Sequence, residues 1–261
     1  PICGRKAGAI AASAMAWGEP SLPTRLSTVA AGRLIYRGED AVALSRHATL
    51  EEIARLLWGI PQPPCLWDDG AAPVHEGDAP LVALARLASA GDAGFERSPS
   101  ALSAQGTRAI AALARSFGVA AGHAPLHDRL AQAWGQDGEG ADLLRQALVL
   151  LADHEFNAST FAVRVTASTG AAIAACLIAG FATLSGPRHG GAAAALELLI
   201  AQAEQTGVEA ALRLWLTMGR EVPGFGHILY PQGDARAAAL LARVPPDPLL
   251  AGLADFVTVT D

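Results

Sequence analysis

The chain contains 261 residues, of which 51% are hydrophobic and 17% are charged, so it has enough apolar surface for a large buried core. The formal net charge is −6 and there is no run of lysine or arginine. This balance argues against nucleic acid or an anionic membrane surface as the main partner, because phosphate binding needs a basic face.

Alanine and leucine dominate the sequence, aromatic residues make up only 5% of it, and strict alternation of apolar and polar residues is rare. We therefore expect an all-α protein. The three cysteines, Cys3, Cys65 and Cys176, are scattered and lack metal-ligand spacing, which fits a reducing cytoplasm. The chain opens at Pro1 without an initiator methionine or a secretory signal, so we expect residues upstream to be missing.

The first clear helix signal lies at Thr49-Leu50-Glu51-Glu52, which has the spacing of a capping box. An apolar stripe follows and stops at Gly59 and Pro61, so the pattern predicts a helix over residues 50–59. The proline-rich stretch 61–80 reads as a loop. Further helical stripes occupy residues 80–90 and 102–117, and the glycines within 135–140 predict another loop.

After Ala141, a helical stripe of Leu144, Ala147, Leu148 and Leu151 carries His154 one turn beyond on the same face. We therefore expect His154 to point inward.

Residues 165–184 carry no charge and raise the question of a membrane helix. Polar residues dilute this stretch and no basic cluster flanks it, so we expect a buried core helix over 171–184. Helices are then expected over 192–204 and roughly 208–218, and another is expected to start at Asp234-Ala235-Arg236.

Three histidines lie at breaks in these patterns. His189 precedes a helix start, where the positive end of the peptide dipoles disfavours the imidazolium form. A neutral imidazole can donate an N–H to a carbonyl oxygen and stabilise an enolate. A helix-capping histidine is the alternative.

His227 follows Pro223-Gly224-Phe225-Gly226, whose glycines can turn backbone N–H groups toward a ligand, although such segments are commonly plain turns. Arg236 offers a planar fork suited to a carboxylate, or is simply solvated. His154 fits either a ligand contact or a satisfied core histidine. We expect no metal site, because His154 has no second histidine at helical spacing.

Taken together, the segments match a family pattern in order and spacing. They are Ala152-Asp153-His154-Glu155-Phe156-Asn157-Ala158-Ser159-Thr160, then Gly186-Pro187-Arg188-His189-Gly190-Gly191-Ala192, then Pro223 to His227 and Asp234-Ala235-Arg236. This set closely resembles the citrate synthase family, and Tyr36-Arg37-Gly38 resembles an early loop of that family. The likeness spans about 34–61 and 145–243.

The resemblance implies roles for individual residues. His189 would hydrogen-bond the acyl-CoA thioester oxygen, and His227 would polarise the keto group of oxaloacetate. His154 and Arg236 would bind the oxaloacetate carboxylates. The backbone that would lie against the CoA adenine comprises Val222, Pro223, Gly224, Phe225 and Gly226.

The resemblance also implies a cytoplasmic homodimer of the tricarboxylic acid cycle. A large helical domain (1–187) and a smaller one (188–261) would close over the substrates and exclude water. No metal or permanently bound cofactor is required, and the coenzyme A thioester is a co-substrate.

Two departures from the family pattern stand out. Ala235 replaces the usual proline before Arg236, and the chain ends at Asp261, before the family's general-base aspartate. Asp255-Phe256 comes too early to be that base, so we expect the base to lie beyond Asp261. A chain without it is expected to be inactive, because general-base catalysis contributes roughly a hundredfold to ten-thousandfold.

The leading hypothesis is condensation of acetyl-CoA with oxaloacetate to give citrate and CoA. A close variant is a 2-methylcitrate synthase that uses propionyl-CoA, since one methylene is worth only about 1–3 kcal/mol of discrimination. The alternative from another class is a non-catalytic protein that binds the same ligands as a sensor or regulator.

Overall fold

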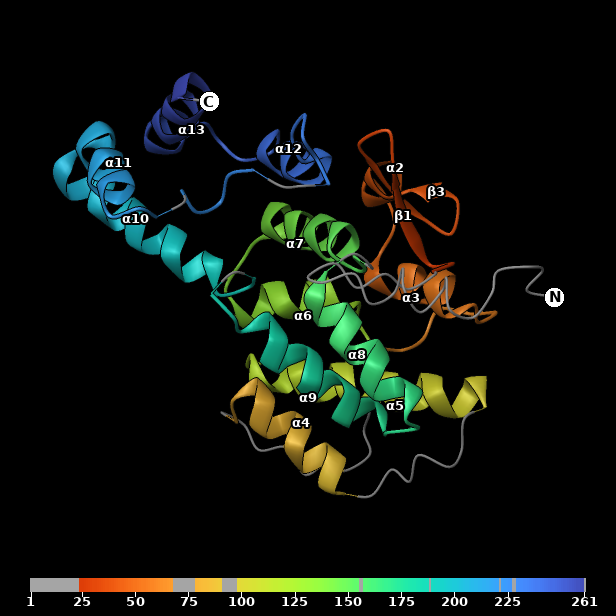
Figure 1. Ribbon diagram of the computed structural model, residues 1–261. Coiled ribbons are helices and arrows are strands. Elements are labelled where there is room, and N and C mark those ends of the chain that lie inside the picture. Colours follow the sequence, from red (N-terminus) through yellow and green to blue (C-terminus); the bar gives the residue numbers. More distant parts are fainter. Residues whose placement is uncertain are drawn as a thin grey trace, which may run out of the picture.

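The computed structural model describes residues 24–67, 78–90, 98–154, 157–187, 189–220, 222–226 and 229–260, with side chains as far as Asp255. These residues are mostly helical, which confirms the all-α class (Figure 1). The helices are α2 (Ala41–Ser45), α3 (Leu50–Trp58), α4 (Pro80–Ser89), α5 (Pro99–Ser116), α6 (Leu126–Ala133), α7 (Gly138–Leu150), α8 (Ala158–Ser168), α9 (Ile173–Leu184), α10 (Ala192–Thr206), α11 (Val208–Thr217), α12 (Ala235–Leu241) and α13 (Pro248–Thr260).

A small antiparallel sheet near the start of the described chain was not expected from the sequence. It contains β1 (Ser27–Ala30), β2 (Arg33–Tyr36) and β3 (Glu39–Asp40), in that order. Ala31 and Gly32 join β1 to β2 with φ values of 50° and 72°, the left-handed conformation that suits a two-residue hairpin. The strands are too short for an alternating pattern to stand out.

The capping box at the start of α3 is confirmed. The Thr49 side chain accepts a hydrogen bond from the Glu52 backbone, and the Glu52 side chain accepts one from the Thr49 backbone. Gly59 ends the helix with φ 67°, which a residue without a β-carbon adopts at no steric cost.

The uncharged stretch 165–184 does not form one long helix. Thr169 and Gly170 make a turn, so the stretch divides between α8 and α9, which pack side by side (Figure 1). A β-carbon at Gly180 would come within 2.4 Å of Val163 Cγ2, so glycine is what allows this close approach. Helix α9 also packs on α4 and α5 as expected of a core helix. Within the described part of the chain, no helix is long and apolar enough to cross a membrane.

One prediction about α7 was wrong and another was only partly confirmed. The helix begins at Gly138, inside the expected loop, because the Asp137 side chain accepts hydrogen bonds from two backbone N–H groups of the first turn. The expected inward face is only partly confirmed: Leu144 and Leu148 pack against a core cluster, but Leu151 is 64% exposed and Arg145 is buried. Because α7 ends at Leu150, His154 lies in the loop that follows rather than on a helical stripe.

The last helices form a hydrophobic cluster of their own. Buried side chains of α10 and α11 pack with Leu253 of α13. Between α11 and α13, the chain crosses to α12, which packs beside α7 and α2 (Figure 1). The expected boundary between residues 187 and 188 falls in the turn between α9 and α10, and the division into two domains stays a prediction.

Candidate active site

The loop after α7 is held in place by the side chain of Tyr36, which is fully buried at the end of β2. Its hydroxyl lies 3.0 Å from the carbonyl oxygens of Val149 and Leu150 and 3.4 Å from that of Asp153. Burial raises the pKa of Tyr36, so the hydroxyl keeps the proton that it donates to these carbonyls. Ser27 of β1 also donates to the Asp153 carboxylate. The residue that follows, His154, therefore extends from a fixed turn.

His154, Tyr230 and Arg236 form a cluster. His154 Nε2 lies 3.2 Å from the Tyr230 hydroxyl, and the Arg236 guanidinium carbon lies 5.0 Å from the centre of the Tyr230 ring. Tyr230 is only 2% exposed, and burial raises its pKa, so it keeps its phenolic proton. The structure thus brings a cation, a phenol and an imidazole together in a largely buried position.

Asp234 orients Arg236 and keeps it charged. Its carboxylate accepts from Arg236 Nε at 3.0 Å and from Nη2 at 2.6 Å, and its Oδ1 also caps α12 through the Arg236 backbone N–H. Burial acts to lower the pKa of Arg236, but the hydrogen bond and charge of Asp234 outweigh it and raise that pKa. Among the described residues, Asp234 engages Nε and Nη2 and leaves Nη1 as the donor that could meet a ligand carboxylate.

His189 is anchored to the start of α8 and not to the cluster directly. Its Nε2 lies 2.9 Å from Ser159 Oγ, and Ser159 Oγ lies 2.7 Å from Asn157 Oδ1. The backbone N–H of Asn157 in turn donates to the carbonyl of His154 at 3.1 Å. A chain of hydrogen bonds therefore connects the His154 turn to the His189 ring.

The hydroxyl of Ser159 has one proton and two possible acceptors. Asn157 Oδ1 already accepts from the Thr160 backbone N–H at 2.7 Å. If Ser159 donates to Asn157, His189 must donate from Nε2, and a neutral ring then presents a lone pair at Nδ1. If Ser159 donates to His189, Nδ1 carries the proton. Only the second arrangement lets a neutral His189 donate from Nδ1 to a carbonyl oxygen.

The glycines after His189 allow the chain to fold back over the end of α9. A β-carbon at Gly190 would lie 2.7 Å from the carbonyl oxygen of Leu184, and one at Gly191 would lie 2.8 Å from that of Gly186. Helix α10 then begins at Ala192, as the sequence predicts. In the structure Gly190 and Gly191 allow close backbone packing. Their contact with a thioester stays a prediction.

The segment 222–226 packs against the start of α10. Val222 and Phe225 contact the α10–α11–α13 cluster, and a β-carbon at Gly224 would come within 3.1 Å of Leu196 Cδ2. Gly224 and Gly226 both have positive φ, in keeping with the expected turn. His227 lies outside the described residues, so its position relative to His189 stays a prediction.

Two cavities lie away from the cluster of His154, Tyr230 and Arg236. One of about 500 Å³ lies between the loop 60–67 and α5, and another of about 620 Å³ lies on α4. The described residues that line them do not include His154, His189 or Arg236. Within the described part of the chain, no three His, Cys, Asp or Glu side chains gather closely enough to hold a metal ion.

The sequence analysis did not identify the residues that hold the predicted histidines in place. Asn157 directly before Ala158-Ser159 is a helix-capping signal, and its side chain does accept from the Thr160 backbone. That signal could have pointed to Ser159 in the first turn of α8. Tyr36 belongs to the Tyr36-Arg37-Gly38 segment that the resemblance marked, but its bonds to the end of α7 could not be predicted, because those partners are remote in sequence. No local pattern marks Tyr230, which meets the equally remote His154.

Comparison with known proteins identifies what the chain is similar to. A family model described as "Citrate synthase, C-terminal domain" matches residues 90–246. The "Putative citrate synthase 2" of Mycobacterium tuberculosis is 31% identical over 238 residues, which cover 81% of this chain and 63% of that protein. The citrate synthase of Haloferax volcanii is 30% identical, with 82% of this chain and 68% of that protein covered. The chain thus spans less than two thirds of the mycobacterial relative.

Solved structures show the same fold. The citrate synthase of Thermotoga maritima superposes with a TM-score of 0.72 at 23% identity, covering 93% of this chain and 77% of that one. The citrate synthase of Thermoplasma acidophilum, in a ternary complex with carboxymethyl coenzyme A and oxaloacetate, superposes with a TM-score of 0.73 at 20% identity, covering 95% of this chain and 79% of that one.

Proposed function

The chain belongs to the citrate synthase family, and on this premise we propose that the protein condenses acetyl-CoA with oxaloacetate to give citrate and free CoA. The observation that carries the proposal is the cluster of the buried Tyr230 with the half-buried His154 and Arg236, which offers a fixed cation and hydrogen-bonding groups to a dicarboxylate. The relative from Thermoplasma acidophilum was crystallised with oxaloacetate and a coenzyme A analogue.

Each predicted residue has a task in this reaction. Arg236 and His154 hold the carboxylates of oxaloacetate. His189 donates an N–H to the thioester oxygen of acetyl-CoA while the methyl carbon loses a proton, which lowers the energy of the enol. His227 protonates the keto oxygen as that carbon attacks the keto carbon. Residues 222–226 lie along the CoA adenine.

The reaction then ends with hydrolysis of the thioester, in which water attacks the carbonyl carbon and CoA leaves as the thiol. Closure of residues 188–261 over residues 1–187 would keep water out until the new carbon–carbon bond has formed. We assign the base that removes the methyl proton to none of the described residues. Asp255 lies exposed on α13 and is not proposed for that task.

The same proposal places the protein in the cytoplasm as a homodimer acting in the tricarboxylic acid cycle, without a permanently bound cofactor or metal. The net charge of −6 supports small-molecule substrates rather than nucleic acid or a membrane surface. The scattered positions of the three cysteines, without metal-ligand spacing, support a reducing compartment.

The test, made like every turnover measurement below on the full-length natural protein, is release of free thiol from acetyl-CoA in the presence of oxaloacetate, with propionyl-CoA in a parallel assay. A kcat/KM higher with propionyl-CoA than with acetyl-CoA would contradict the proposal and identify a 2-methylcitrate synthase instead. If calorimetry shows oxaloacetate binding but neither thioester releases thiol, the result would contradict the proposed enzyme activity and support the alternative of a non-catalytic sensor.

His189→Ala tests the role of the imidazole. We expect turnover to fall about a hundredfold or more, because an oxygen-stabilising donor is lost, with oxaloacetate affinity nearly unchanged. His47→Ala, an exposed histidine after α2, is the matched control and should leave turnover as it is. Equal turnover in His189→Ala and the unmodified protein would remove the proposed role.

A further inference from the structure

Helix α12 carries Arg236, yet apolar packing does little to hold it. None of its residues is buried, and none belongs to the hydrophobic clusters of the described chain. Its neighbours are α7 and α2 (Figure 1). Since burial of apolar surface is the main force that fixes a helix in a fold, the position of α12 must depend largely on polar contacts.

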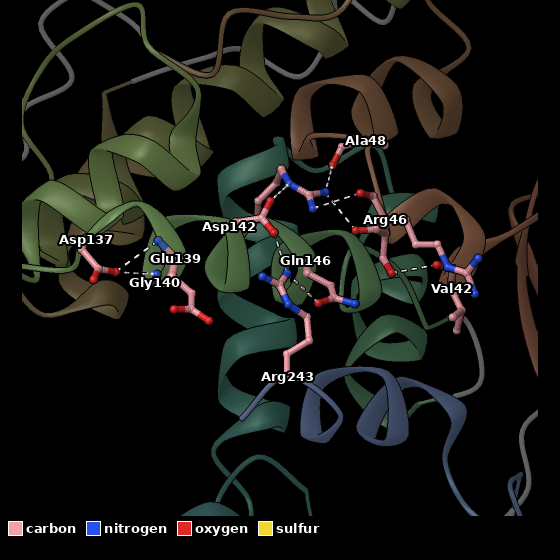
Figure 2. Close-up of polar contacts among 11 residues, drawn as sticks. Val42, Arg46, Ala48, Asp137, Glu139, Gly140, Asp142, Gln146 and Arg243 are labelled. Atoms are coloured by element: carbon pink, nitrogen blue, oxygen red, sulfur yellow. Dashed lines mark hydrogen bonds and ion pairs between the residues drawn. The ribbon is translucent and has the colours of Figure 1, made fainter. Parts of the chain in front are cut away.

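A polar contact that joins this region to α7 lies just beyond the end of α12. Arg243 Nη1 lies 2.5 Å from Asp142 Oδ2 and 3.2 Å from Gln146 Oε1, both on α7 (Figure 2). Gln146 is buried, and the Arg243 side chain is one third exposed at 32%. The Asp142 side chain is 44% exposed, so solvent partly screens the ion pair, and the contact with the buried Gln146 is its more sheltered part.

Asp142 can serve as an anchor because a second arginine fixes it. Its Oδ1 accepts from Arg145 Nε at 2.7 Å. Arg145 is buried, and its Nη1 donates to the carbonyl oxygens of Ser45 at 2.9 Å and Ala48 at 2.8 Å, at the end of α2. The carboxylate is therefore shared between two guanidinium groups, one on its own helix and one after α12. We call Asp142, Arg145 and Arg243 the clamp.

The opposite end of α12 is fixed by the substrate residues. Asp234 caps the helix and pairs with Arg236, whose guanidinium lies over Tyr230. The helix is thus held at its start by the predicted oxaloacetate site and at its end by the clamp. Movement of either end would shift Arg236.

We propose that Asp142, Arg145 and Arg243 are positioning residues for the keto-acid site: they hold α12 against α7 and α2 so that Arg236 faces the substrate carboxylate. This inference rests on the proposed function. Its physical basis is that a misplacement of about 1 Å in a binding group can cost about a hundredfold in rate. None of the three clamp residues touches the substrate.

The test replaces Arg243 with methionine, which keeps much of the chain length and removes the charge. We expect the KM for oxaloacetate to rise roughly tenfold, the loss typical of one hydrogen bond to a charged group. The KM for acetyl-CoA and the kcat at saturating oxaloacetate should stay within about twofold. Arg243→Lys, which keeps a cation near Asp142, should restore part of the oxaloacetate affinity.

Arg213→Met is the matched control. Arg213 forms an exposed ion pair with Glu209 on α11, with the two side chains 70% and 67% exposed, so its loss should change neither KM. Amide hydrogen exchange of residues 235–242 without any substrate gives a second readout, and it should quicken in Arg243→Met but not in Arg213→Met.

The outcomes separate this inference from the proposed function. An unmodified protein that neither binds nor converts oxaloacetate would overturn both. If the unmodified protein binds oxaloacetate, unchanged exchange in Arg243→Met would overturn the clamp alone. Faster exchange with unchanged oxaloacetate affinity would also overturn the positioning role. An equal loss for oxaloacetate and acetyl-CoA would indicate a general structural defect and contradict it as well.

Discussion

At the scale of single residues, the direction of one hydroxyl proton decides what His189 can do. Ser159 lies between Asn157 and His189, within hydrogen-bond distance of both. Because Asn157 Oδ1 also receives the Thr160 N–H, it keeps one partner when Ser159 turns away. In the structure the hydroxyl donates to Asn157 Oδ1 at 2.7 Å, so a neutral His189 presents Nδ1–H to a thioester only after the Ser159 proton turns toward Nε2.

Replacement of Ser159 by alanine should reveal this dependence. We expect kcat to fall roughly tenfold, because His189 Nε2 loses the hydroxyl that holds its ring in place and governs its tautomer. Oxaloacetate affinity, measured by calorimetry, should change little. Ser168→Ala is the control at the other end of α8, where the hydroxyl bonds only the Val165 carbonyl among the described residues. Full turnover in Ser159→Ala would contradict the tautomer argument.

At the scale of elements, local signals predicted the helices well and tertiary contacts poorly. The capping box of α3 and the start of α10 follow from neighbouring residues, so the sequence reveals them. The buried face of α7 does not follow, because Arg145 is buried only through the carbonyls of α2. Hydrophobic periodicity assigns arginine to the surface. The same reason hid Tyr230, which meets His154 across 76 positions of sequence.

Arg145→Met tests how much this buried arginine contributes to the attachment of α2 to α7. We expect the free energy of unfolding to fall by roughly 2–5 kcal/mol, since carbonyls at the end of α2 lose their charged donor while staying buried. Urea denaturation followed by circular dichroism measures the change. Arg213→Met, which breaks only an exposed pair, should cost less than about 1 kcal/mol. Similar losses in the two variants would contradict this assignment.

At the scale of the whole molecule, α7 is the element on which distant segments meet. Tyr36 of the sheet hydrogen-bonds the carboxyl end of α7. The end of α2 and the segment after α12 bind α7 at the clamp (Figures 1 and 2). The hydrogen bond from Arg145, together with that from Arg243, lowers the pKa of Asp142 against a smaller opposing effect of burial. Folding therefore favours the ionised carboxylate.

The free energy of unfolding should consequently fall as the pH is lowered. A carboxyl group with a lowered pKa in the folded state stabilises the fold above its unfolded pKa of about 4, and this contribution is lost as the pH falls through the folded value. We expect the unfolding free energy of Asp142→Asn to fall less steeply below about pH 4 than that of the unmodified protein. Glu209→Gln, in the exposed pair, should keep the original slope. Parallel pH profiles for all three proteins would refute the prediction.

The hydroxyl of Tyr36 also has a consequence for the order of folding. It bonds carbonyl groups 113 and 114 positions further along the chain, and His154 meets Tyr230 across another long interval. Contacts between such remote positions require large loops to close, whereas helices form from neighbouring residues. The keto-acid site should accordingly form late in folding. A refolding chain should regain its helical circular dichroism signal before it regains affinity for oxaloacetate.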